Sequence, residues 1–494
     1  MTQNMALAQT GRPVVLVFSR AYIADEFRDN VTPLADEYDF RFLCDGRKPG
    51  TEDTRARFYH YWKAGGKFTD LSDWEIDDCV CRCRLLRNLP REKAERMLHA
   101  MAHTLHEYME HNQPDLVLSH LVDEYITHLI SIFAARRGIL YIAYVFSYFS
   151  GYVQVLEGSY GAPFKYRRPS DEEVTAICEK YSVGDFRQDY AQRPKGTWFR
   201  QFKSVLRYNA KLAYFRLKRI IENDPLNMHY MITPYVAEHR RMSDLPAKNS
   251  FDIDWRAKLA TRKQDGQTVL FMPLGYFPES AIDYWVRDTS IIEYEQKTIE
   301  IASNLAQSYC VAVKEHPHMV GSRNPEFYHR LKYTKNVVMI PPEEHGTNLI
   351  MQTDATLVGA GSAGVEAGLR KKPVFTYCDT SYWFEGSRSV FLPLSQTSRW
   401  PALIDKALPE LERTDPQAPS VLASECLQST ARQKPAKGRW PLCDATDLRN
   451  LLNAGLARSR SKHEAELQSF SPRRTALNET SNAAPFPTNS RPAK

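Results

Sequence analysis

The chain has 494 residues, 43% of them hydrophobic and 25% charged, which is the composition of a folded protein too long for one ordinary core. Its formal net charge of +6 suits anionic lipids and phosphate ligands as well as nucleic acid. No run approaches the roughly 20 apolar residues of a transmembrane helix, which excludes a bilayer-spanning protein. The nine cysteines do not show the regular spacing of a disulfide-rich secreted protein, which excludes a disulfide scaffold. No secretory signal pattern opens the chain, and we expect a cytoplasmic protein.

Residues 1–169 have the pattern of an α/β domain. An apolar run at residues 13–19 is typical of a buried parallel strand, and residues 115–119 begin another. A helical pattern at residues 124–137 and a strand at residues 139–146 follow. Strand, helix and strand in this order predict a parallel sheet with crossover helices.

Two patterns in this domain resemble metal sites. They are Cys79, Cys81 and Cys83, interpreted as alternate residues of one strand, and His99, His103 and His106 on one face of a predicted helix. Alternate residues of a strand cannot close a tetrahedral site alone, and no carboxylate of suitable spacing joins the histidines. We therefore expect packing cysteines, a solvated histidine face and no metal.

Residues 170–260 are predicted to be a helical segment with a basic amphipathic helix at residues 197–220. Its apolar residues recur at spacings of three and four, and its seven positive charges are accompanied by no acid. Such a helix suits the surface of an anionic membrane. It can equally pack on a lobe with its basic face solvated. The sequence contains no recognisable nucleic-acid reader, so nucleic acid is not an expected partner.

Residues 261–395 predict a second Rossmann-like domain. Strands are expected near residues 268–272, 310–314, 337–340, 355–358 and 373–377, alternating with helices. Helices at residues 396–458 and a Ser-, Arg-, Pro- and Asn-rich tail at residues 459–494 follow. That tail can bury little apolar surface, so we expect it to be disordered.

The loop Gly359-Ala-Gly-Ser-Ala-Gly364 joins a predicted strand to a predicted helix. Glycines allow close approach of a phosphate, the helix N-terminus favours an anion, and Ser362 can add a hydroxyl donor. The letters also match a dinucleotide fingerprint, with Asp379 about 20 residues further on. That fingerprint normally opens its domain, whereas this loop comes late in it. A glycine turn that serves only strand–helix packing is the third interpretation.

Two further segments follow predicted strands. In Lys314-Glu315-His316-Pro317-His318, the proline favours an extended His316 at the carboxyl end of a strand, where it can donate to a phosphate and stabilise a leaving nucleotide. In residues 273–280, Tyr276, Glu279 and Ser280 are predicted to contact substrate, although Ser280 can simply cap the next helix.

These motifs occur in an order that resembles a known family. The order is P-L-x-x-x-P-E-S, K-E-H-P with a following Gly-Ser-Arg and Phe-Tyr, N-V-V-M-I-P-P, D-A-T-L-V-G-A-G-S-A-G-V-E-A and K-K-P-V-F. Over about residues 265–385 the sequence resembles the C-terminal lobe of bacterial capsule and surface polysaccharide glycosyltransferases of the GT-B fold. The resemblance implies two Rossmann-like domains facing a cleft, a nucleotide-sugar donor, a glycan or lipid-linked acceptor, and other polysaccharide-assembly proteins as partners.

The resemblance also implies that His316, Ser362 and Glu366 contact the donor nucleotide and its phosphates, with Gly361 and Gly364 shaping the loop. We predict His316 as a catalytic group, and with the other residues of the two motifs the predicted nucleotide-binding residues are Lys314, Pro317, Gly359, Gly361, Ser362, Ala363, Gly364 and Glu366. The sequence lacks the pair of glutamates eight positions apart found in many retaining members, and it has no convincing Asp-x-Asp motif. We therefore expect an inverting, metal-independent reaction that needs no cofactor besides the donor.

An inverting transfer needs a general base, expected from the N-terminal lobe. Asp25 and Glu26 follow the first predicted strand, and Asp123 and Glu124 follow the strand that ends at Ser119. Each pair can instead begin a helix and compensate its dipole. Two other classes stay open: a different nucleotide-dependent enzyme on the same fold, such as a non-hydrolysing sugar epimerase or a polyol-phosphate transferase, and a non-catalytic scaffold. Lipid-linked acceptors favour a place on the inner face of the cytoplasmic membrane.

Overall fold

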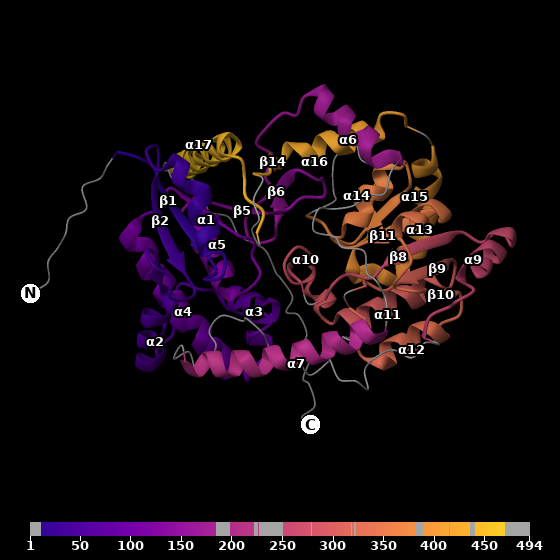
Figure 1. The fold of residues 1–494 in the computed structure, drawn as a ribbon, viewed down its shortest axis with the longest axis horizontal. Helices are drawn as coiled ribbons and strands as arrows, with labels where there is room; N and C mark the ends of the chain where they lie inside the picture. The colour runs from indigo at the N-terminus through magenta and orange to yellow at the C-terminus, as the bar shows by residue number, and fades with distance from the viewer. Residues whose placement is uncertain are drawn as a thin grey trace, which may run out of the picture.

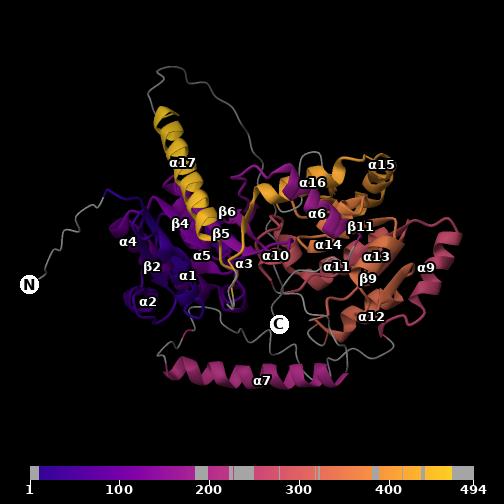
Figure 2. The ribbon, with the colours of Figure 1, turned by 45° about the horizontal axis from the view of Figure 1, so that its top comes forward.

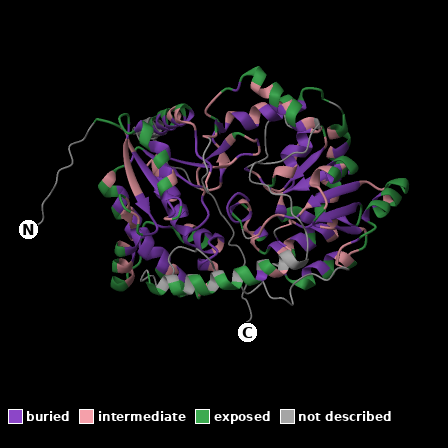
Figure 3. Cartoon of the chain, viewed as in Figure 1, coloured by how far each residue is buried: buried purple, intermediate pink, exposed green. Residues whose placement is uncertain are grey.

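The computed structural model describes residues 11–183, 198–221, 226, 250–277, 279–317, 319–320, 323–380, 389–413, 415–434 and 440–469. These residues form two α/β lobes that lie side by side (Figure 1). Figure 3 shows that the strands of both sheets are buried beneath helices. The fold class predicted from the sequence, two Rossmann-like α/β domains, is confirmed.

The N-terminal lobe is built on a sheet with the strand order β14-β6-β5-β4-β1-β2-β3. The strands are β1 (Val14–Ser19), β2 (Asp39–Cys44), β3 (Glu52–Asp53), β4 (Leu116–Ser119), β5 (Leu140–Phe146), β6 (Tyr152–Glu157) and β14 (Thr430–Arg432), and β7 (Ala162–Pro163) pairs with β6. β1 to β5 are parallel, whereas β6 and β14 pair antiparallel. β1 is almost wholly apolar because helices cover both faces of a parallel sheet.

The helices of this lobe correct two expectations. They are α1 (Ala24–Val31), α2 (Thr54–Ala64), α3 (Asp73–Arg82), α4 (Arg91–Asn112) and α5 (Tyr125–Arg136). A capping box between Ser72 and Glu75 begins α3, so the C-x-C-x-C run lies on a helix and its C-cap, not in a strand. The expected solvated histidine face is also wrong, because His99 is buried and the rings of His103 and His106 pack against Phe68.

The C-terminal lobe has a parallel sheet with the strand order β10-β9-β8-β11-β12-β13. The strands are β8 (Val269–Pro273), β9 (Cys310–Lys314), β10 (Val337–Ile340), β11 (Ala355–Val358), β12 (Val374–Thr376) and β13 (Ser389–Phe391). The helices are α9 (Trp255–Gln264), α10 (Ser280–Asp283), α11 (Tyr294–Leu305), α12 (Pro325–Tyr333), α13 (Gly346–Gln352), α14 (Ser362–Leu369), α15 (Trp400–Glu412) and α16 (Ala418–Gln428). In chain order the strands lie 3-2-1-4-5-6, which is the Rossmann arrangement.

The chain crosses between the lobes more often than the sequence pattern indicated. α6 (Asp171–Val183) packs against α14 and α16 of the C-terminal lobe. After α16 the chain returns through β14 to α17 (Ala445–Ser469), which packs on β4, β5 and α1. α17 continues well past Ser459, which was the expected start of the tail, and Ser459 is buried there and accepts a hydrogen bond from the Leu140 amide at 3.0 Å. Residues 470–494 of that predicted tail lie outside the described residues.

The predicted basic helix is α7 (Trp198–Ile221). It runs along the lower edge of the molecule beneath both lobes in Figures 1 and 2. Much of it is exposed in Figure 3. Among the residues that the structure describes, no helix is both long and apolar enough to cross a bilayer.

Candidate functional site

Both sheets reverse their strand order at one place, which we call the switch point of that lobe. In the N-terminal lobe it lies between β1 and β4, and in the C-terminal lobe between β8 and β11. Open α/β sheets bind ligands beside such a point, outside the carboxyl ends of the strands. The loops after β8 and β11 are the P-L-x-x-x-P-E-S segment and the glycine loop. The two motifs therefore flank the C-terminal switch point.

The first two glycines of that loop have different surroundings. A Cβ at Gly359 would lie 2.8 Å from the Tyr377 ring, whereas a Cβ at Gly361 would meet nothing within 4 Å among the residues that the structure describes. Gly361 is exposed and is the N-cap of α14, so the first free amides of the helix adjoin open space. Packing explains Gly359, and room for an anion remains at Gly361.

The rest of the loop belongs to α14. Ser362 and Ala363 form its half-buried first turn, and Gly364 is buried inside it. Glu366 is buried one turn further on, where its carboxylate accepts a hydrogen bond from Thr347 at 2.6 Å and lies 3.3 Å from Arg370. The Glu366 carboxylate thus ties α14 to α13 within the lobe.

His316 lies two residues beyond the end of β9 and is half-buried. Its ring centroid is 5.5 Å from that of Tyr276, with the rings nearly perpendicular at 70°. The carbonyl of His316 accepts the Met319 amide at 2.8 Å, which closes a turn around Pro317. The structure therefore brings the K-E-H-P motif into contact with the segment at residues 273–280.

A buried ion pair holds both of these loops. Arg323 Nε lies 2.6 Å from the Glu315 carboxylate, and both side chains are fully buried. Glu315 also accepts the His316 amide at 2.6 Å, and Arg323 donates to the Gly275 carbonyl at 2.6 Å. Tyr294 completes the arrangement by accepting the Gly275 amide at 2.6 Å. Burial by itself would lower the pKa of Arg323, but Glu315 outweighs it and the pKa is raised.

Lys314 ends β9 beside this network and is buried. Its ammonium donates to the Glu315 carbonyl at 3.2 Å. Burial lowers the pKa of Lys314 to about 8, against the opposing attraction of Glu315, Glu343 and Glu344. The lysine therefore adds positive charge next to His316 at neutral pH.

Glu279 and Ser280 lie at the start of α10, directly after the loop from β8. Glu279 is exposed to solvent, and desolvation by the protein around it raises its pKa to about 7. Arg84 opposes the shift and Asp283 adds to it. Ser280 is buried, and its hydroxyl oxygen accepts from Arg84 at 3.4 Å.

The lobes are joined beside Glu279 by arginines of the N-terminal lobe. Arg84 and Arg87 donate to the fully buried Asp283 carboxylate at 2.6 and 2.8 Å. Arg82 donates to the backbone carbonyls of Asp283, Val286 and Arg287. Such charge-assisted contacts hold the segment at and after α10 of the C-terminal lobe against the end of α3 and the residues that follow it.

The N-terminal switch point is a cluster of acids around a buried arginine. Arg20 follows β1 and lies 3.2 Å from Asp45, 2.8 Å from Asp123 and 3.8 Å from Glu124. His120 lies 3.3 Å from Asp123. Burial favours a higher pKa for Asp123, but Arg20 and then His120 outweigh it and lower that pKa strongly. Burial dominates at Glu124 and raises its pKa well above the ordinary range.

The two pairs of acidic residues predicted to supply the general base therefore lie in different surroundings. Asp123 and Glu124 are at the switch point, whereas Asp25 is exposed in the first turn of α1 and pairs with Lys48 at 2.6 Å, a hydrogen bond that lowers its pKa. Glu26 is half-buried in the same turn. The sequence interpretation missed Arg20, Asp45 and His120. Their position directly after β1, β2 and β4 is the signal that can find them.

Two alternative chemistries find little support in this geometry. The glycine loop follows β11, the fourth strand of its sheet, whereas a dinucleotide fingerprint occupies the first strand–helix turn. The carboxylate of Asp379, which that fingerprint would use for ribose, lies 3.5 Å from Arg287. In the described part of the chain, no three His, Cys, Asp or Glu side chains are grouped to hold a metal ion, and all nine cysteines are free.

Comparison with known proteins gives only distant likenesses. No protein-family model matches the sequence, and no curated protein matches it. Among solved structures, KpsC of Thermosulfurimonas dismutans, a beta Kdo 2,7 transferase, is similar with a TM-score of 0.33 and 8% identity over 88% of this chain and 98% of its own. UDP-GlcNAc 2-epimerase of Neisseria meningitidis bound to UDP-GlcNAc has a TM-score of 0.25 and 12% identity over 89% of this chain and 100% of its own.

These similar structures include a beta Kdo transferase, which is a sugar-transferring enzyme, as are the proteins that the sequence resembles. The structure of S. aureus MnaA with UDP is a further similar structure, with a TM-score of 0.27 and 11% identity over 94% of this chain and 100% of its own. At such scores the likenesses carry no argument about the reaction. The two-lobed fold rests on the strand orders of the two sheets.

Proposed function

We propose that the chain is a glycosyltransferase that moves a sugar from a nucleotide-sugar donor to a growing surface polysaccharide or a lipid-linked acceptor, with inversion and without a metal. The observation that carries this proposal is the open space at Gly361, at the N-terminus of α14 and beside the switch point of a Rossmann sheet. Helix N-termini of this kind bind phosphate through free amides and the helix dipole.

The donor side of the reaction uses positive and hydrogen-bonding groups of the C-terminal lobe. The diphosphate or monophosphate of the donor would lie against the first turn of α14, with Ser362 as an added donor. His316, held edge-on by Tyr276, would donate to the phosphate oxygen that keeps the electron pair when its bond to the anomeric carbon breaks. Lys314 adds a positive charge behind it.

The acceptor side needs a base for the attacking hydroxyl. As the acceptor oxygen bonds to the anomeric carbon, its proton passes to a carboxylate, and the nucleotide departs from the opposite side. Glu279 suits this role because it is accessible, lies beside the C-terminal switch point and has a pKa of about 7. Asp123 is a weak base because its pKa is strongly lowered, and Glu124 is buried.

A thermal-shift series with UDP, CMP, GDP, CDP and NAD tests the donor site. A nucleotide present at about 100 times its dissociation constant stabilises a protein by about 2.7 kcal/mol. We expect Gly361→Val to lose the nucleotide response while its melting temperature falls only slightly, because the added Cβ meets no described neighbour within 4 Å and the cost is confined to the helix N-cap. His316→Ala should weaken the nucleotide response. Tyr333→Ala, at an exposed position of α12, should leave that response unchanged.

A full nucleotide response in Gly361→Val, or stabilisation by NAD alone, would contradict the donor site. The epimerase alternative is tested by incubating the protein with UDP-GlcNAc and no acceptor. An epimerised sugar under those conditions assigns the chain to that class. Once a donor is found, Glu279→Gln should abolish the acid limb of the pH–rate profile near pH 7, where the wild-type pKa lies.

We also infer that α7 rests on an anionic membrane surface. Leu206, Tyr214, Leu217, Ile220 and Ile221 are each more than half exposed. At about 100° per residue they fall within an arc of about 120° on the helix. Exposed Arg207 borders that arc, exposed Lys203 lies within it near the same edge, and the helix contains no acid. Exposure of the apolar stripe favours lipid contact over the alternative in which this stripe packs on a lobe.

Flotation with phosphatidylcholine vesicles, with and without phosphatidylglycerol, tests this inference. We expect flotation that depends on the anionic lipid and that is lost in Leu206→Ser/Leu217→Ser/Ile220→Ser. Ile253→Ser, which removes another exposed apolar side chain outside α7, is the matched control. Lys203→Gln/Arg207→Gln should weaken binding by about 1 kcal/mol per charge. The inference is wrong if flotation does not depend on the anionic lipid, or if the triple variant floats as well as the wild type.

A further inference from the structure

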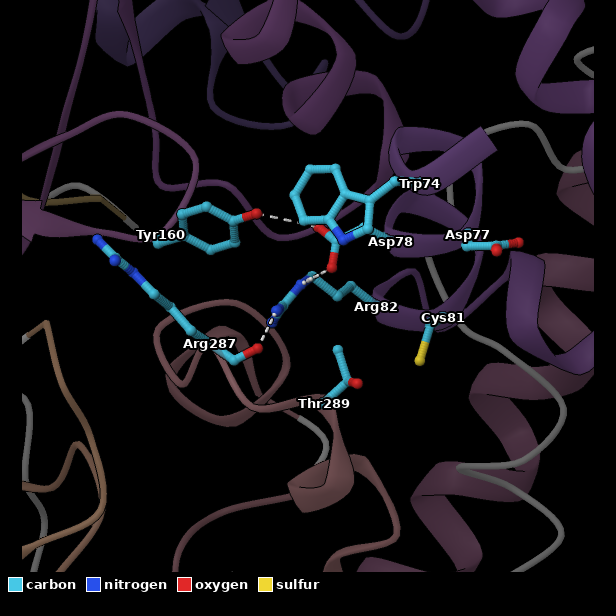
Figure 4. Close-up of a pocket in the computed structure, with 8 residues that line it drawn as sticks. All are labelled: Trp74, Asp77, Asp78, Cys81, Arg82, Tyr160, Arg287 and Thr289. Carbon is cyan, nitrogen blue, oxygen red and sulfur yellow. Dashed lines mark hydrogen bonds and ion pairs between the residues drawn. The ribbon is translucent and has the colours of Figure 1, made fainter. Parts of the chain in front are cut away.

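A pocket of about 650 Å³ opens where α3 of the N-terminal lobe faces the segment after α10 of the C-terminal lobe. It is lined by Trp74, Asp77, Asp78, Cys81, Arg82, Tyr160, Arg287 and Thr289. Figure 4 shows these side chains around a common space, with the α3 residues on one side and Arg287 and Thr289 on the other. The volume lies within the range of about 300–1,000 Å³ that is typical of small-molecule sites.

The floor of the pocket is a buried polar network. Arg82 Nε lies 2.7 Å from one oxygen of Asp78, and the Tyr160 hydroxyl donates to the other at 3.3 Å. The Arg82 guanidinium also lies 5.1 Å from the Tyr160 ring centroid. The remaining nitrogens of Arg82 are held by carbonyls of the C-terminal lobe. The floor is therefore fixed before any ligand arrives.

The rim presents an aromatic ring and charged groups to solvent. Trp74, the second residue of α3, is 64% exposed, which is unusual for so large an apolar side chain. Asp77 stands one turn along the helix and is also largely exposed. Arg287 lies over the Tyr160 ring at 5.6 Å from its centroid, and its side chain is mostly exposed.

We propose that this pocket binds a saccharide unit of the glycan acceptor. The flat face of an exposed indole packs against the C–H face of a pyranose ring, as an amphipathic aromatic does where one side of its partner is apolar. Carboxylate oxygens of Asp77 and Asp78 accept protons from ring hydroxyls, and Arg287 and Thr289 donate or accept at its edge. The identification of that saccharide as the acceptor rests on the proposed glycosyltransferase function.

The charges of the pocket separate a sugar from a nucleotide. A nucleobase can also stack on Trp74, but its phosphates would find Arg82 already engaged by Asp78 and by carbonyls of the C-terminal lobe. The open amides and positive charge suited to phosphate lie instead at Gly361 and Lys314. Because residues of both lobes line the pocket, a bound saccharide would contact both lobes at once.

The test is binding to an array of oligosaccharides from bacterial capsular polysaccharides and lipopolysaccharides. We expect the wild type to bind members of the array, Trp74→Ala to bind them about tenfold more weakly or worse, and Trp74→Phe to stay within about threefold of the wild type. Tyr333→Ala, which removes an exposed aromatic outside the pocket, should bind normally. The nucleotide thermal shift of Trp74→Ala should equal that of the wild type.

Three results overturn the proposal: no oligosaccharide binds the wild type, Trp74→Ala binds as well as the wild type, or Trp74→Ala loses the nucleotide response and so assigns the pocket to the donor. A further result separates this proposal from the proposed function. If no nucleotide stabilises the protein while glycan binding still depends on Trp74, the glycosyltransferase assignment fails and the saccharide pocket stands.

Discussion

The two lobes share a strand order and differ in the chemistry at their switch points. In the C-terminal lobe the loop at the switch point carries the uncrowded Gly361, and the neighbouring strand β9 ends in the buried cation Lys314 and is followed by His316. In the N-terminal lobe the corresponding strand ends carry acids around Arg20. The same topology thus offers one surface for an anion and another for hydroxyl groups, and the side chains after each strand make the difference.

Each lobe also has one buried arginine that ties together segments following different strands of its sheet, and this similarity yields the largest expected effect. Arg323→Met should destabilise the protein by about 3–5 kcal/mol, because Glu315 is left charged and unpaired in the core. Arg330→Met, at an exposed position of the following helix α12, should change stability by less than about 0.5 kcal/mol. Chemical denaturation followed by circular dichroism measures both. An equal, small loss in the two variants would show that the ion pair does not support the loops.

The glycine loop provides the next comparison within one lobe. Gly359→Ala should cost about 1–3 kcal/mol, because its Cβ would overlap the Tyr377 ring. Gly361→Ala should cost less than about 1 kcal/mol, because its Cβ meets no described neighbour within 4 Å and only the N-cap preference for glycine over alanine is lost. Melting curves without ligand decide the matter. Equal destabilisation would mean that both glycines serve packing.

The smallest expected effect concerns Glu124 and depends on pH. Its pKa is raised in the folded state, so above the pKa of about 4.3 in the unfolded chain, the unfolded chain loses this proton while the folded protein keeps it. The free energy of unfolding therefore falls as pH rises towards the pKa of the folded state. Glu124→Gln removes that slope, worth at most about 1.4 kcal/mol per pH unit. The difference in unfolding free energy between the two proteins, measured across this range, should grow with pH. A constant difference would show that Glu124 ionises as freely as in the unfolded chain.

Local patterns predicted the parallel strands well, because apolar runs such as that in β1 are buried on both faces whatever surrounds them. The glycine loop and the segment after β8 were found for a similar reason, since each follows a strand directly. By contrast, spacing alone misread the C-x-C-x-C run, which a capping box places on a helix. The histidines of α4 were expected to be solvated, but a distant Phe68 packs on their rings.

Sequence patterns were likewise insufficient to identify the candidate base. The sequence indicated acids of the N-terminal lobe, because strand ends mark a cleft, and it assigned Glu279 only to substrate contact. The accessibility of Glu279 and its raised pKa depend on how the folded protein surrounds it. Likewise, Arg323 lies within the motif that carries the resemblance, yet its bond to Gly275 joins loops that are far apart along the chain.

The sequence by itself determined two α/β lobes, a glycine loop at a strand end and a basic amphipathic helix, because each depends on periodicity or on neighbours along the chain. The tertiary structure decided which glycine faces open space, which acids are buried around Arg20, and that α3 and the segment after α10 enclose a pocket. These features arise from contacts between residues hundreds of positions apart, such as Arg84 and Asp283 across the two lobes. Local patterns carry no record of such contacts.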